Sequence, residues 1–82
     1  MMPMQFQNIL TLTDTKNSGS GAAISSGLNT STAYLLEAFS KGYKLEPYEA
    51  ASGNIFLDVR TPNSDQAVTN TDITYTVVYI NK

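Results

Sequence analysis

The sequence predicts an α+β domain in which one helix packs on a face of a small, mainly antiparallel sheet. Two observations lead to this prediction. Several short segments alternate apolar and polar residues, as strands with one buried face do, and one segment, residues 31–41, has helical spacing and helix-end signals. The elements follow in the order β-(β)-α-β-β-β. With 82 residues and no repeat or linker, residues 1–82 form a single domain. A small β-sandwich with a helical connection is the alternative fold.

The first predicted strand covers residues 4–13. Its apolar and polar side chains alternate, so that one face carries Met4, Phe6, Leu10 and Leu12. Residues 14–21 follow as a loop, because Asp, Asn, Ser and Gly are common among them. Residues 22–26 have small side chains and are the candidate second strand, the element in parentheses in the predicted order.

Residues 31–41 are the predicted helix. Each of the three residues Asn29, Thr30 and Ser31 offers an oxygen that could cap its first turn. Gly42 is placed to end the helix in a left-handed conformation. An apolar stripe between these ends would face the sheet, formed by Leu35, Leu36, Ala38 and Phe39.

Three further strands complete the predicted sheet. Residues 43–46 form a short strand stopped by Pro47, which suits a sheet edge. Residues 54–60 alternate with some apolar residues on both faces. Residues 73–80 give the strongest strand signal, because both faces are apolar or β-branched. Such a strand belongs in the middle of a sheet or in a sheet that is covered.

The residue types that most enzyme chemistry needs are missing. The chain has no His and no Cys, which excludes Ser-His and Cys-His nucleophiles and ordinary zinc sites. The net charge is −2 and the five cations are scattered, so no patch could neutralise several phosphates of a nucleic acid. We therefore expect a protein that is not an enzyme, with no catalytic residue, metal, cofactor or nucleic-acid partner.

Asp58 is the acid best placed for carboxylate chemistry, since it lies in the middle of a predicted strand. Its alternative role is that of an exposed strand residue that pairs with Arg60 or with a neighbouring chain. We favour the alternative, because a chain of 82 residues has little material to build a deep pocket.

Signals for membrane insertion and export are also missing. No apolar run reaches the ~18–20 residues that cross a bilayer. Residues 1–6 lack the positive and apolar regions of a secretory signal peptide. The sequence therefore predicts no membrane insertion. It does not fix the localisation, although a place in a virus particle is the expectation that follows from its composition and size.

Composition and size favour a structural subunit that assembles with neighbours. Charged residues make up 15% of the chain, against about 25% in an average domain. A chain this short, without disulfides or zinc, has marginal stability alone. We expect it to pack with copies of itself or in a larger protein lattice, as coat, decoration or tail components of virus particles do. Tyrosine suits such contacts, and the predicted interface residues are Phe6, Leu10, Tyr75, Tyr79 and Ile80.

The alternative function is an extracellular, adhesin-like or ligand-binding module. Residues 39–45 (Phe-Ser-Lys-Gly-Tyr-Lys-Leu) place a glycine–tyrosine step after the predicted helix, and residues 72–82 include a strand rich in Tyr and Val. These two segments, less than a third of the chain, resemble the mucin-binding repeats of bacterial surface proteins. The resemblance does not extend to the first forty residues. It implies binding to a glycoprotein.

Overall fold

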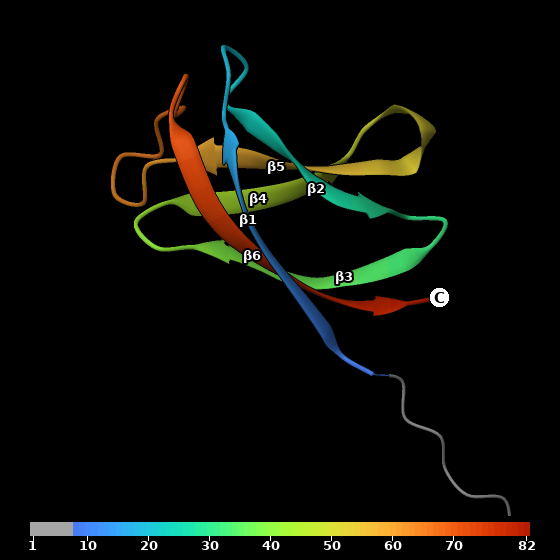
Figure 1. Ribbon diagram of the computed structural model, residues 1–82. Helices are drawn as coiled ribbons and strands as arrows, with labels where there is room; N and C mark the ends of the chain where they lie inside the picture. The colour runs from blue at the N-terminus through green and yellow to red at the C-terminus, as the bar shows by residue number, and fades with distance from the viewer. Residues whose placement is uncertain (1–7) are drawn as a thin grey trace, which may run out of the picture.

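The computed structural model describes residues 8–82 and consists of two three-stranded antiparallel sheets that pack as a small β-sandwich (Figure 1). One sheet has the strand order β1-β6-β3 and the other β2-β5-β4. A 3₁₀ turn at Ala51–Gly53 is the one helical element among the described residues. The strands are β1 (Leu10–Asn17), β2 (Ala23–Asn29), β3 (Ala33–Ser40), β4 (Lys44–Glu49), β5 (Asn54–Arg60) and β6 (Asp72–Asn81).

The predicted α+β fold is therefore wrong, because the predicted helix at residues 31–41 is strand β3. This strand pairs with β6 along its whole length, from Ala33 opposite Asn81 to Ser40 opposite Tyr75. The β-sandwich alternative describes the two sheets better, although loops and the short 3₁₀ turn replace its helical connection.

A β-bulge in β3 explains why its sequence has helical spacing. The register shifts between Leu35 and Glu37, so one extra residue is inserted opposite β6. As a result Leu35 and Ala38, three positions apart, both pack against the core. A regular strand would place them on opposite faces. Gly42 does have a positive φ, 91°, but it lies in the turn between β3 and β4.

The other strands differ from the prediction mainly in their boundaries. β5 covers residues 54–60 as predicted, and β6 is the middle strand of its sheet, as its two-sided pattern indicates. β1 continues to Asn17, into the predicted loop, while residues 4–7 lie outside the described part of the chain. β4 is an edge strand as predicted, but it continues through Pro47, which pairs in register with Leu57. An edge position tolerates proline because its nitrogen can face away from the partner strand.

The core lies between the two sheets. Alternate residues of β6 point inward, and they meet alternate residues of β5 from the opposite sheet. Val68, from the segment between β5 and β6, adds a further apolar side chain. The buried cluster consists of Ile24, Leu57, Val59, Val68, Ile73, Tyr75 and Val77.

Candidate interaction surfaces

The outer face of the β2-β5-β4 sheet carries charges that are paired with one another. Arg60 donates a hydrogen bond to the Asp58 carboxylate at 2.7 Å. Lys44 lies 3.0 Å from Glu46 and 3.4 Å from Asp65. These partners raise the pKa of Lys44, chiefly through the hydrogen bond to Glu46, and the bond to Asp58 raises the pKa of Arg60. The predicted pairing of Asp58 with Arg60 is confirmed, so this carboxylate has a structural partner.

The outer face of the β1-β6-β3 sheet is mostly uncharged. One end of it has rows of hydroxyl groups from β1 and β6. Thr13 and Thr76 share a hydrogen bond of 2.9 Å between their side-chain oxygens, and Thr15 and Thr74 share one of 2.8 Å. Because these hydroxyls are hydrogen-bonded to each other, this part of the face exposes threonine methyl groups and oxygens that already have a hydrogen-bond partner.

Beside the threonine rows, the same face carries apolar side chains of β3 and β6, with the Glu37 carboxylate among them opposite Val78. Register and alternation place Tyr34 beside Ile80 and Phe39 beside Thr76, all on the side away from the core. Tyr34, Leu36 and Phe39 are 56%, 51% and 47% exposed, respectively. Exposed apolar side chains gathered in one place are typical of interaction sites, whereas isolated ones are ordinary. We call this group, Tyr34, Leu36, Phe39, Val78 and Ile80, the β3–β6 apolar patch.

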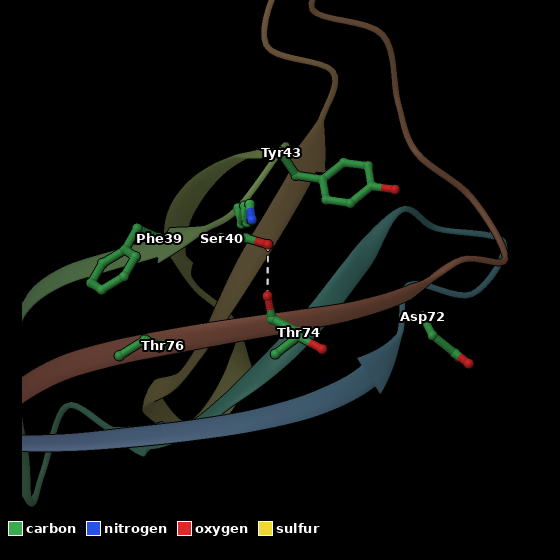
Figure 2. A pocket seen from close by; sticks show the side chains of 7 residues that line it. Phe39, Ser40, Tyr43, Asp72, Thr74 and Thr76 are labelled. Carbon is green, nitrogen blue, oxygen red and sulfur yellow. Dashed lines mark hydrogen bonds between the residues drawn. The ribbon is translucent and has the colours of Figure 1, made fainter.

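An open hollow of about 430 Å³ lies where β3 ends and β6 continues (Figure 2). Ser40 donates a hydrogen bond to the Thr74 carbonyl at 2.7 Å across it. The Phe39 ring lies at one end and Tyr43 and Asp72 lie toward the other, so the walls combine aromatic and polar groups. Its size is within the range of small-molecule sites. The lining residues are Phe39, Ser40, Lys41, Tyr43, Asp72, Thr74 and Thr76.

The predicted interface residues occupy different environments. Tyr75 is only 1% exposed, and its hydroxyl donates to the Ser25 carbonyl at 3.2 Å, so its side chain belongs to the core and offers no surface to a partner. Leu10 and Tyr79 face each other across β1 and β6 and are half-buried, and Tyr79 packs against the core cluster from the inward face of β6. Ile80 is half-buried beside Tyr34. Phe6 lies outside the described residues.

Sequence reasoning missed Tyr34, Leu36 and Phe39 as surface residues, because it placed them in or beside a helical stripe. A signal was present: this segment has large apolar residues at both odd and even positions. In a strand that pattern puts apolar side chains on both faces.

A scan against protein-family models, a search of curated proteins and a search of solved structures found no match to this chain. Among residues 8–82, no three acidic side chains gather in a group that could hold a metal ion. The described residues also form no helix with the length and hydrophobicity needed to cross a membrane. Function is therefore inferred from the surfaces described above.

Proposed function

We propose that this protein is a non-enzymatic structural subunit that assembles with copies of itself or within a larger protein lattice, of the kind that forms the coat, decoration or tail of a virion. The observation that carries the proposal is the β3–β6 apolar patch, with three large side chains about half exposed on one sheet. The outer face of the other sheet, with its paired charges, suits contact with solvent.

The patch offers a clear energetic gain on assembly. A buried aromatic side chain removes 150–250 Å² from water, so the exposed half of Tyr34 or Phe39 amounts to roughly 100 Å². At about 25 cal/mol per Å², covering one such ring contributes about 2.5 kcal/mol before the entropic cost of association. Covering the patch also carries a desolvation cost, because Glu37 lies opposite Val78 on this face and the Lys82 ammonium lies 4.6 Å from the centre of the Tyr34 ring.

Size-exclusion chromatography with light scattering, run over a range of concentrations, tests this function. We expect the mass of the unmodified protein to rise above that of the monomer, and the double variant Tyr34→Ser/Phe39→Ser to associate at least about tenfold more weakly. Tyr48→Ser is the matched control, because Tyr48 is 46% exposed on the opposite outer face. A protein that is monomeric throughout and has no partner in its source particle would refute the proposal. An equal effect of Tyr48→Ser would refute the assigned face.

A second candidate is an extracellular, adhesin-like ligand-binding module, and the hollow beside β3 favours it. Phe39 and Tyr43, which belong to the segment that resembles mucin-binding repeats, line that hollow. Binding to an immobilised glycoprotein tests this function directly. Saturable binding that Tyr43→Ala weakens would support it, and the absence of saturable binding would remove it.

A further inference from the structure

We propose that two copies of this chain join edge to edge through β1, in an antiparallel β1–β1 ladder centred on Thr13. This proposal rests on the assembly function above and specifies both the partner, a second copy, and the geometry of the contact. It concerns the edge of the β1-β6-β3 sheet, which is separate from the β3–β6 apolar patch on its face.

The free edge of β1 is available for pairing. In the sheet order β1-β6-β3, the one strand of residues 8–82 that pairs with β1 is β6 (Figure 1). Residues 11–15 are all exposed. An unpaired strand edge presents backbone donors and acceptors to any strand that approaches it.

Two hydrogen bonds establish which backbone groups lie on that edge. The Ser18 amide donates to the Thr71 carbonyl at 2.8 Å, which continues the β1–β6 register and shows that even-numbered positions point toward β6. The Thr15 amide instead donates to the carboxylate of its neighbour Asp14 at 2.8 Å. Since adjacent residues of a strand point their backbone groups to opposite sides, the N–H and C=O groups of Thr11, Thr13 and Thr15 face the free edge.

Of the two-fold registers of β1, the one centred on Thr13 pairs each of its threonines with a threonine. With the two-fold axis at Thr13, Thr13 faces Thr13 and Thr11 faces Thr15 of the second copy. The threonine rows shared with β6 then continue across the axis on the outer face. Asp14 lies opposite Leu12 of the second copy, so the two Asp14 carboxylates are diagonal neighbours and do not face each other directly. A register centred on Asp14 would place two carboxylates opposite each other, which is destabilising.

The same register adds apolar contact on the inner side of the sheet. Leu12 is partly exposed in the single chain even though it points toward the core side of β1. In the ladder, the two copies of Leu12 are diagonal neighbours, which long side chains can bridge. This self-match is the reason to assign the edge to a second copy rather than to an unrelated extended peptide.

Asp14 limits the strength of this contact. Its carboxylate occupies the Thr15 amide, which the ladder needs as a donor to the Thr11 carbonyl of the second copy. Charged side chains that occupy an edge in this way are a known protection against uncontrolled pairing. Removal of the carboxylate by Asp14→Ala should therefore strengthen association, about threefold or more, as judged from the modest net energy of one hydrogen bond.

Amide hydrogen exchange, followed residue by residue at low and high protein concentration, tests the ladder in the unmodified chain. We expect the Thr11 and Thr13 amides to exchange freely in the dilute monomer and about tenfold more slowly at concentrations where the mass shows a dimer. Association without protection of Thr13 would overturn the ladder while leaving the assembly function standing. A monomer at every concentration would overturn the ladder, and it would overturn the assembly function as well if the protein has no partner in its source particle. Protection that arises only with an added peptide, and never from self-association, would assign the edge to a different partner.

A pair of variants provides the second test. Thr11→Pro removes an edge N–H that β6 does not use, so the single chain should still fold. Thr11→Val keeps that N–H and a β-branched side chain. We expect Thr11→Pro to weaken dimerisation at least about tenfold relative to Thr11→Val, because each copy loses one hydrogen bond across the axis. Equal dimerisation by the two folded variants would refute the ladder, and if Thr11→Pro fails to fold, the exchange experiment decides.

Discussion

Replacement of Ser26 by Ala should destabilise the domain far more than the loss of a single oxygen atom would suggest. Ser26 is fully buried in β2, where the register with β5 is interrupted between Ser25 and Asn29. Its hydroxyl donates to the Ile55 carbonyl at 2.6 Å and accepts a bond from the Leu28 amide at 3.1 Å. Where the pairing of β2 with β5 is irregular, the Ser26 hydroxyl thus replaces hydrogen-bond partners that backbone groups would supply in a regular ladder.

The expected loss follows from these two bonds. Each buried backbone group left without a partner costs about 1–3 kcal/mol, and Ser26→Ala removes the partner of the buried Ile55 carbonyl and of the part-buried Leu28 amide. We expect a loss of about 2–4 kcal/mol, from a total stability of roughly 4–12 kcal/mol for a chain of this length. That loss would lower the melting temperature by roughly 10–25 °C.

Urea unfolding followed by tyrosine fluorescence measures this loss. An unchanged m-value would show that the substitution leaves the compactness of the folded and unfolded states unchanged. Ser25→Ala is the matched control at the adjacent position. The Ser25 hydroxyl accepts one bond, from the Gly27 amide at 3.1 Å, at an exposed site where water can replace it. We expect Ser25→Ala to cost less than about 1 kcal/mol. Equal losses for the two variants would refute the assigned role of Ser26.

Three further predictions test the turns, the predicted interface and the ion pairs. Gly53→Ala should lower stability by about 1–3 kcal/mol more than Gly42→Ala. Both glycines have positive φ, but a Cβ at Gly53 would lie 2.7 Å from the Thr30 hydroxyl, whereas a Cβ at Gly42 would have no atom within 4 Å. Equal losses in urea unfolding would contradict the clash. Tyr79 packs against the core cluster, so Tyr79→Ala should lower the melting temperature and leave association, measured by light scattering, unchanged; weakened association without a loss of stability would instead assign Tyr79 to an interface. The pKa of Lys44 is raised above its ordinary value of 10.5, so the charged side chain stabilises the fold at every pH below 10.5. This stabilisation is lost as the pH rises through the folded-state pKa of Lys44. The stability difference between the unmodified chain and Lys44→Met should therefore close above that pH in alkaline unfolding curves, and a constant difference would contradict it.

Strands with regular alternation were predictable from the sequence, and the irregular strand was not. β5 and the central position of β6 follow from period-two patterns that no insertion interrupts. The nature of β3 depends on a bulge whose partner is β6, some forty residues away in the sequence. Local spacing cannot reveal such a pairing, since a bulge turns a period of two into an apparent spacing of three.

The exposed faces of the strands were harder to predict than the strands themselves, because this requires knowing which face of each strand packs on the core. Both faces of β6 are apolar or β-branched, so the pattern alone allows Tyr75 on either side. The second sheet covers the face with Tyr75 and Val77 and leaves Val78 and Ile80 on the other. The tyrosine-based argument for contact residues therefore fails for Tyr75, whose hydroxyl finds its partner inside the domain.

The bulge in β3 predicts that deletion of Leu36 will be tolerated. Leu35 lies opposite Tyr79 and Glu37 opposite Val78, so removal of the residue between them leaves a continuous ladder in which every other β3 side chain keeps its face. The cost should be small, because Leu36 is about half exposed. Deletion of Phe56 is the control.

β5 has no bulge at Phe56, so that deletion would move part of the strand by one position and turn either Leu57 and Val59 or Ile55 out of the core. We expect the chain without Leu36 to unfold cooperatively, with a melting temperature within about 10 °C of the original, and the chain without Phe56 not to fold. If deletion of Leu36 also prevents folding, the extra residue is needed for the strand to bend. In that case the β3–β6 apolar patch depends on the bulge for its shape as well as for its position.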